Sequence, residues 1–349
     1  MLYTVDTRNI NTAVRWGLEH LLHSGIEEES RNGKVLVAPG PVCTIYNNPK
    51  ERILFSPARD ANPFFHLFEA LWMLAGRNDL DFPRQFNKRF REYSDDGSIV
   101  WGAYGWRWRD FFNYDQLAAI IDELKKNPTS RRCVLAMWNG MHVYETERSE
   151  YLPIESDLCI ARKGGKDVPC NTHAYFDVRG GMLNMTVCNR SNDAIWGAYG
   201  ANVVHFSLLQ EYMAEQIGVN VGLYYQFSNN FHAYLDIYNR EALEKIADEA
   251  GKSNMYNIWP AMTKNIPLGS TQRDWHEDLG TFLNGGQAHP TRESFFTRIA
   301  APMYDAWFLH KDGDSVAAMD RLKEMPECDW KFVAVGWVER RMKGKENAA

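Results

Sequence analysis

DVPCNTHAYFDVRGGMLNMTVCNRSNDAIWGAYGAN, residues 167–202, holds a hairpin and several reactive groups in one stretch. Apolar residues alternate on both sides of Arg179-Gly180-Gly181, which predicts two antiparallel strands joined by a tight turn. Cys170 opens the first strand, and Arg190 follows the second. We therefore expect the Arg190 guanidinium to lie near the Cys170 sulfur, where its charge lowers the pKa of the thiol. A small buried cysteine is the alternative interpretation.

The composition indicates a globular chain without a polymeric partner. The 349 residues are 45% hydrophobic, and the net charge is −6 with no basic block, which argues against binding a nucleic-acid polymer. No apolar run is long enough to span a membrane, and the N-terminus lacks the apolar core of a signal peptide. The six cysteines form no C-x-x-C pair, so we expect no disulfide framework and no metal site. We expect a cytoplasmic protein.

The remaining pattern mixes helices and strands. We expect helices over residues 9–23, 64–76 and 203–217, a strand over 131–139, and a long helix from near Leu235. Further helices are expected over 295–309 and 316–341. This order predicts an α/β (α+β) fold with a mixed sheet and without a glycine-rich dinucleotide loop.

Glu69 is an unusual residue in an otherwise apolar helix, FFHLFEALWMLAG (64–76). A buried carboxylate is costly unless it is paired or protonated. Pairing with His66 or with a distant arginine is the structural interpretation. The functional interpretation is a proton-transfer group.

Arginines at two places and an amide at a third suggest a nucleotide ligand. Arg190-Ser191 offers a guanidinium fork and a hydroxyl to a phosphate. Arg131-Arg132 begins a strand, and taken alone it favours a solvated strand end over a phosphate site. Asn202 precedes a helix, so it is either the N-cap or a residue that reads the edge of a base.

Several of these motifs in order resemble the thymidylate synthase family, including its pyrimidine-nucleotide hydroxymethylase branch. The matching stretches are the helix containing Glu69, GAYGWRWRDF (102–111), Arg131-Arg132, Pro169-Cys170, NRSND with GAN (189–202) and FHAY (231–234). The resemblance covers about residues 9 to 245 and implies a thymidylate synthase-like fold. We expect a catalytic domain over residues 1–250 and a divergent, mostly helical C-terminal extension over 251–349.

The resemblance implies a role for each catalytic residue. Cys170 is the expected nucleophile at C6 of the pyrimidine ring, and Arg190 lies beside it. Glu69 is expected to relay protons through water, and Tyr104 to remove the C5 proton. Asn202 is expected to read O4 and N3–H of uracil, which favours dUMP over dCMP. One residue more than usual separates Asp193 from Asn202.

The resemblance also implies the binding residues. The expected phosphate ligands are Arg31, Arg190 and Ser191, joined by Arg131 and Arg132 from the other subunit of a homodimer. The sugar 3′-hydroxyl is expected at His232 and Tyr234. The expected contacts with the co-substrate 5,10-methylenetetrahydrofolate are Asp193, Gly197, Phe90 and Tyr93.

Departures from the family pattern bear on the product. Asn171 stands where the family has histidine, Asn189 where it has glutamine, and Phe90 and Tyr93 where it has two tryptophans. The C-terminus is polar, whereas the synthase ends in a short apolar tail that excludes water during hydride transfer. Access of water to the exocyclic methylene would give 5-hydroxymethyl-dUMP. The alternatives are a thymidylate synthase, a dCMP hydroxymethylase and a nucleotide-binding regulator without catalysis.

Overall fold

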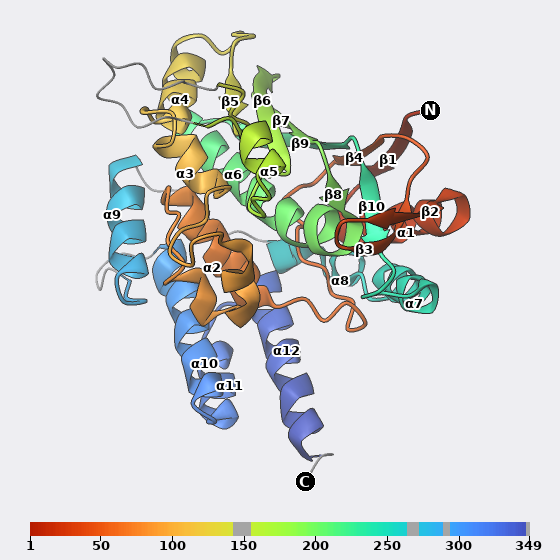
Figure 1. The fold of residues 1–349 in the computed structure, drawn as a ribbon. Helices are drawn as coiled ribbons and strands as arrows, with labels where there is room; N and C mark the ends of the chain where they lie inside the picture. Colours follow the sequence, from red (N-terminus) through yellow and green to blue (C-terminus); the bar gives the residue numbers. More distant parts are fainter. Residues whose placement is uncertain (142–154, 264–271, 289–293, 347–349) are drawn as a thin grey trace.

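A six-stranded mixed sheet forms the centre of the computed structural model, which describes residues 1–141, 155–263, 272–288 and 294–346 (Figure 1). Its strands, in spatial order, are β1 (Tyr3–Thr7), β4 (Val42–Tyr46), β9 (Asn220–Ser228), β7 (Met182–Asn189), β6 (Asn171–Arg179) and β5 (Val134–Ala136). The β1/β4 and β7/β9 pairs are parallel, and the other three pairs are antiparallel. The expected mixed sheet and the β6–β7 hairpin are confirmed.

A second, four-stranded sheet lies beside the open end of that hairpin. Its order is β2 (Ile26–Ser30), β3 (Gly33–Val37), β10 (Phe231–Tyr234) and β8 (Asn192–Asp193). The short strand β8 follows β7 after only two residues, and β10 follows β9 after two. The two sheets therefore meet where the β6–β7 hairpin ends.

Two buried helices, α2 (Pro63–Leu74) and α6 (Asn202–Ile217), pack against each other. Asn62 caps α2 by accepting a hydrogen bond from Phe65 N at 3.1 Å, and Pro63 occupies the first turn, where its missing N–H costs nothing. Ten of the twelve α2 residues are buried, consistent with its apolar composition. α6 ends at Gly218, whose φ of 87° is easily adopted only by glycine.

The other helices surround these elements. They are α1 (Ile10–Ser24), α3 (Tyr104–Arg109), α4 (Gln116–Lys126), α5 (Asp157–Arg162), α7 (Arg240–Lys252), α8 (Met255–Ile258), α9 (Gln272–Leu283), α10 (Ala301–Lys311), α11 (Ser315–Lys323) and α12 (Asp329–Glu346). Shorter helical segments are the 3-10 turns Pro83–Gln85, Lys88–Tyr93 and Pro260–Thr263, and the π-helices Ala194–Ala201 and Phe296–Ala300. None of the described helices combines the length and apolar character that crossing a membrane requires.

The C-terminal helices share a core with the rest of the chain. In Figure 1, α10, α11 and α12 lie beside α2 and extend away from both sheets. Aromatic contacts join them, since the ring of Phe64 lies 5.4 Å from those of both Trp307 and Trp337. Buried apolar residues from Val5 to Val338 form a single cluster. The domain boundary at residue 250 stays a prediction.

Three expected elements differ in the structure. The helix expected near Leu235 begins at Arg240, because Phe231–Tyr234 is extended and pairs with both β3 and β8. The helix expected over 316–341 is two helices, since Pro326 lacks the N–H that a continuous helix needs. The strand expected over 131–139 is limited to Val134–Ala136.

Candidate active site

Strand pairing places Cys170 and Arg190 together at the open end of the β6–β7 hairpin. Asn171 pairs with Asn189 in the ladder, and Arg190 N donates to Cys170 O at 2.9 Å. The Arg190 Nη2 atom lies 3.8 Å from the Cys170 sulfur. The expected proximity is therefore confirmed.

The guanidinium of Arg190 is held by the backbone that precedes the cysteine. Its Nε donates to Pro169 O at 2.8 Å, and Nη2 donates to Val168 O at 3.0 Å. It also lies over the Trp138 ring, 5.7 Å from the ring centroid. These contacts fix the charge beside the sulfur.

The expected low pKa of the Cys170 thiol is not found. Burial raises this pKa above its ordinary value, and Asp167 adds to the increase. Arg190 and Arg31 lower it, but their charges do not outweigh the loss of solvation. The thiol is therefore protonated in the unliganded enzyme at neutral pH.

Tyr104 holds the backbone of the nucleophile in place through its hydroxyl group. Its hydroxyl oxygen accepts hydrogen bonds from Cys170 N at 3.1 Å and Asn171 N at 3.2 Å. The next residue, Gly105, lets α3 approach the end of α2, because a Cβ there would lie 2.0 Å from Met73 O. Burial raises the Tyr104 pKa, so its hydroxyl stays protonated.

Glu69 lies beside a histidine of α6 and not beside the groups expected from sequence. His205 Nε2 is 3.2 Å from Glu69 Oε2, and the two side chains are 3% and 13% exposed. The interpretation that Glu69 pairs with His66 or an arginine is therefore wrong. The α2–α6 contact places these two titratable groups together, with the ring of His66 6.4 Å from that of His205.

Asn202 is the first residue of α6, but it is not an N-cap. Its backbone is helical (φ −61°, ψ −43°), and it continues directly from the π-helix Ala194–Ala201. This segment has a break in its helical geometry at Gly200 (φ −115°, ψ −107°). The Asn202 side chain is thus free to bond inward: Nδ2 donates to Asn192 Oδ1 at 3.0 Å, and Oδ1 accepts from Asn171 Nδ2 at 3.4 Å.

The second sheet brings further predicted residues toward the hairpin. Arg31 lies in the β2–β3 turn, and its charge acts on the Cys170 thiol. Its neighbour Asn32 donates to the Tyr234 hydroxyl at 3.4 Å. His232 is held by Asn230, whose Oδ1 lies 2.7 Å from its Nδ1. Ser191, between Arg190 and β8, is half-buried.

The residues expected to contact folate divide into two groups. Asp193 begins the π-helix and accepts hydrogen bonds from Ile195 N at 2.9 Å and from Trp196 N, and burial raises its pKa to about 6. Gly197 lies one helical turn further along the same π-helix. Of the aromatic pair, Phe90 is 5% exposed and packs in the core, whereas Tyr93 is 53% exposed. Only Tyr93 therefore presents a ring to a ligand.

Arg131 and Arg132 do not join this cluster within one chain. Both are exposed and line an open hollow before β5, together with Glu123 and Ser130. Across the described ranges, no hydrogen bond or ion pair connects either arginine with Cys170 or Arg190. Their position at an exposed strand end leaves them available to a neighbouring subunit.

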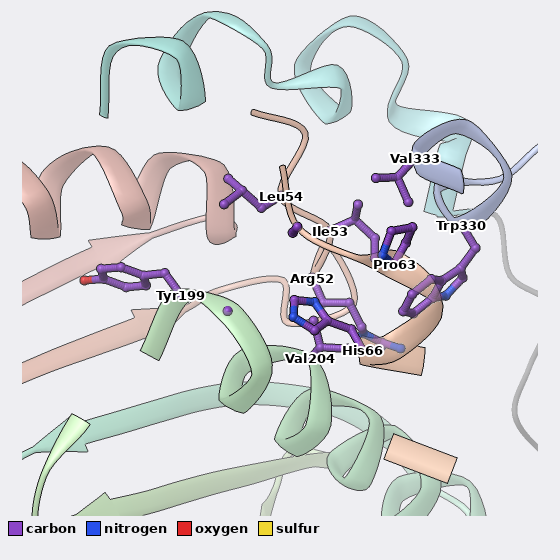
Figure 2. Close-up of a pocket in the computed structure, with 11 residues that line it drawn as sticks. Arg52, Ile53, Leu54, Pro63, His66, Tyr199, Val204, Trp330 and Val333 are labelled. Atoms are coloured by element: carbon purple, nitrogen blue, oxygen red, sulfur yellow. The ribbon is translucent and has the colours of Figure 1, made fainter. Parts of the chain in front are cut away.

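A cavity lies behind the α2–α6 pair (Figure 2). Its volume is about 20 Å³, which is room for a single water molecule. His66 of α2, Val204 of α6, and Trp330 and Val333 of α12 are among its walls. The C-terminal helix α12 therefore forms one wall of this cavity. The cavity is too small for a substrate.

Two residues of the site had not been singled out from the sequence. Asn192 contacts Asn202, and His205 contacts Glu69. A histidine within the apolar run of α6 is a detectable signal, since buried histidines need a partner. Asn192 carries no such signal, because its importance comes from strand β8 lying beside β10 and Asn202.

Comparison with known proteins identifies related sequences of one family. A family model described as "Thymidylate synthase" matches residues 17–266. The chain is 44% identical to the deoxyuridylate hydroxymethyltransferase of Pseudomonas phage M6 over 348 residues, which cover 97% of this chain and 94% of that protein. It is 37% identical to the deoxyuridylate hydroxymethyltransferase of Bacillus phage SP01, over 61% of this chain and 54% of that protein. A thymidylate synthase of Symbiobacterium thermophilum is 29% identical over 50% of this chain and 60% of that protein.

Proposed function

Because this chain belongs to the thymidylate synthase family, we propose that it transfers one carbon from 5,10-methylenetetrahydrofolate to C5 of dUMP and releases 5-hydroxymethyl-dUMP. Cys170 adds to C6, and the activated C5 attacks the methylene carbon. Loss of the C5 proton then releases tetrahydrofolate and leaves an exocyclic methylene. Water adds to this methylene, and Cys170 leaves from C6 as the ring double bond forms again. The products are 5-hydroxymethyl-dUMP and tetrahydrofolate, so no dihydrofolate forms.

The observation that carries this proposal is the arrangement at the end of the hairpin. The Cys170 sulfur, the Arg190 guanidinium, the Tyr104 hydroxyl and the Asn202 amide are joined through direct contacts or through Asn171. A nucleophile, a cation and a base-reading amide within one connected set are what covalent activation of a nucleotide requires. We propose that Arg190, Ser191 and Arg31 bind the phosphate, and that His232 and Tyr234 bind the sugar hydroxyl.

The Cys170 thiol needs activation during the reaction. Its pKa lies above the ordinary value, so the thiolate forms only as the substrate is engaged. Arg190 then stabilises the sulfur charge from 3.8 Å. We propose that the C5 proton leaves to a water held at the Tyr104 hydroxyl, which itself stays protonated, and that Glu69, beside His205, relays protons to the pyrimidine ring.

Asn202 supports uracil as the base. Its Nδ2 group has two hydrogens and its Oδ1 two lone pairs, and the bonds to Asn192 and Asn171 use one of each. One donor and one acceptor remain. They match O4 and N3–H of uracil, which is why dUMP is the proposed substrate and dCMP is not.

The residues present fit the folate co-substrate. The Asp193 Oδ2 atom is buried and has no hydrogen-bond partner among the described residues, so a donor from a ligand would satisfy it. Tyr93, which the family resemblance also assigns to the folate site, has an exposed ring that a ligand could contact. When bound, the folate supplies the methylene carbon. We propose that Asp193, Gly197 and Tyr93 hold it, whereas the buried Phe90 supports Tyr93 through an edge contact at 5.9 Å.

Hydroxymethylation is preferred over methylation for two reasons. The phage M6 relative, named a deoxyuridylate hydroxymethyltransferase, matches 97% of the chain and therefore includes the C-terminal helices. The thymidylate synthase of Symbiobacterium thermophilum matches only 50%.

A product assay tests the proposal. Purified protein is incubated with methylenetetrahydrofolate and either dUMP or dCMP, and the nucleotide is analysed by mass spectrometry. We expect hydroxymethylated dUMP without dihydrofolate. Methylated dUMP with equal dihydrofolate would show a synthase instead. Cys170→Ala should abolish release of the C5 hydrogen, while Cys188→Ala on the same hairpin should retain it.

A further inference from the structure

A buried network of polar side chains fixes the orientation of the Asn192 amide. Asn192 Nδ2 donates to Ser228 Oγ at 2.9 Å and to Gln226 Oε1 at 3.3 Å. Gln226 in turn donates through Nε2 to the Tyr224 hydroxyl at 2.9 Å. Asn192, Gln226 and Ser228 are each at most 2% exposed, so water cannot replace these bonds.

That orientation fixes the neighbouring amide as well. With Nδ2 committed to β9, the oxygen of Asn192 faces Asn202 and accepts from its Nδ2 at 3.0 Å. A rotation of the Asn202 amide by 180° would place two carbonyl oxygens face to face and would also oppose the Asn171 Nδ2 donor to a second amide nitrogen. The reversed orientation is therefore strongly disfavoured.

Gly197 leaves room for this bond. A Cβ at Gly197 would lie 2.6 Å from Asn192 Oδ1 and 3.3 Å from Asn202 Nδ2. The π-helix thus passes directly over the two amides and limits their movement.

A fixed amide discriminates between bases, but a rotating amide does not. Uracil presents an acceptor at O4 and a donor at N3, whereas cytosine presents the reverse pair. An asparagine that could rotate freely would satisfy either base by exchanging its nitrogen and oxygen. Asn202 alone is therefore insufficient to select uracil.

We propose that Asn192 is the residue that makes Asn202 specific for uracil, by holding its amide in one orientation through the Gln226–Ser228 network. This inference rests on the proposed function, since it names what determines the base selectivity of the same site. Asn192 acts as a positioning residue and does not itself touch the base.

Replacement of Asn192 tests this inference through the ratio of kcat/KM for dUMP to kcat/KM for dCMP. Asn192→Leu keeps the approximate volume but removes the acceptor for Asn202, so this ratio should fall by about tenfold or more, with dCMP gaining relative to dUMP. Asn192→Asp keeps an oxygen facing Asn202 Nδ2 and should retain a ratio close to that of the wild type. A merely structural role would lower both kcat/KM values by the same factor and leave the ratio unchanged.

Asn184→Leu is the matched control. Asn184 lies on β7, where its Oδ1 accepts from Leu223 N at 2.9 Å, and it makes no contact with Asn202 in the described structure. This variant should leave the ratio unchanged. If Asn192→Leu does not fold, Gln226→Met removes the acceptor that orients Asn192 and should shift the ratio in the same direction. A ratio within about twofold of wild type in the folded variant would overturn the inference.

Binding measurements separate this inference from the proposed function. Calorimetry with dUMP and dCMP gives the ratio of dissociation constants without turnover. If the wild-type protein binds dUMP selectively but forms no product, the proposed reaction is wrong while the inference is still tested by Asn192→Leu. If the protein makes hydroxymethyl-dUMP and Asn192→Leu keeps its selectivity, the inference alone is wrong.

Discussion

The Cys170 thiol is governed by two opposing effects, burial and the charge of Arg190. Burial dominates, so the resting thiol has a raised pKa. A reactive cysteine that stays protonated until substrate arrives is protected from oxidation and alkylation. The nearby Arg190 guanidinium limits the increase in the Cys170 pKa, and this effect on the pKa can be measured.

Alkylation of Cys170 should therefore depend on pH and on Arg190. The rate with iodoacetamide, followed by mass spectrometry of the Cys170 peptide, should rise as pH increases through the raised pKa, because only the thiolate reacts. Arg190→Met removes the charge 3.8 Å from the sulfur and should shift this profile to higher pH. Arg179→Met, at the tip of the hairpin, is the control. A profile unchanged by Arg190→Met would show that the guanidinium does not stabilise the thiolate.

His205 gives a second prediction for a single residue. Because His205 Nε2 lies 3.2 Å from Glu69 Oε2 and both side chains are largely buried, His205→Leu should lower kcat by roughly 10²-fold or more, with little change in KM for dUMP. His205→Gln keeps a nitrogen donor at a similar position and should restore part of kcat. His20→Leu is the control, since the His20 ring stacks on Tyr3 and not on Glu69 or His205. Equal losses for the Leu and Gln variants would argue against positioning of Glu69.

The sequence allowed a correct prediction of single residues only where local order determined the geometry. Cys170 and Arg190 are brought together by one hairpin, so alternation and a turn were sufficient to predict their contact. The partner of Glu69 could not be predicted, because it depends on how α2 packs against α6. The thiol pKa was predicted in the wrong direction, since burial is a property of the whole fold and not of the hairpin.

At the scale of elements, the loop before α2 links the π-helix Ala194–Ala201 to the C-terminal helix α12. The expected helices and strands were largely present, because their apolar periodicity was strong. β10 was missed, since its extended conformation comes from pairing with β3 and β8 and not from local composition. The π-helix Ala194–Ala201 before Asn202 was also not predicted from the sequence.

The loop before α2 connects α12 to the Asp193 side of the site. Asp60 accepts hydrogen bonds from Arg340 and Arg341 of α12, each through Nη2 at 2.9 Å. Asp60 has a φ of 44°, a left-handed conformation that non-glycine residues rarely adopt. The adjacent Arg59 donates to Ile195 O at 3.2 Å, and its charge lowers the pKa of Asp193 against the larger effect of burial. We therefore expect the ion pairs of α12 with Asp60 to hold the loop before α2 in the conformation in which Arg59 bonds to Ile195 of the π-helix.

Breaking this connection should affect the folate and not the nucleotide. Asp60→Ala should raise KM for methylenetetrahydrofolate by roughly three- to tenfold, with kcat and KM for dUMP nearly unchanged. Asp305→Ala, which breaks the ion pair with Arg321 at 2.9 Å between α10 and α11, should change neither KM. Removing Arg340 and Arg341 in the Asp60→Ala background should add little, because the same connection is already lost. A parallel rise in both KM values would contradict this role for α12.

At the scale of the whole molecule, one face of the central sheet is incompletely covered. Strand register places Val134, Tyr175, Thr186, Tyr225 and Ile45 in one row across five strands. Val134 and Tyr175 are 45% and 46% exposed, and the other three are partly exposed. A row of this kind is suited to contact with the same face of a second copy, as expected for the homodimer that family resemblance implies. Arg131 and Arg132 precede the strand at one end of this row.

Coexpression of two inactive variants tests whether the arginines act across such a dimer. Cys170→Ala lacks the nucleophile, and the double variant Arg131→Glu, Arg132→Glu lacks the proposed phosphate ligands. In a mixed dimer, the site with the intact Cys170 also receives intact arginines from its partner. Random pairing should then restore about one quarter of wild-type activity, because half the dimers are mixed and each has one complete site. Placing all three substitutions in one chain, coexpressed with Cys170→Ala, should restore none. Absence of rescue in the first mixture, with dimers shown by light scattering, would place Arg131 and Arg132 outside the neighbouring site.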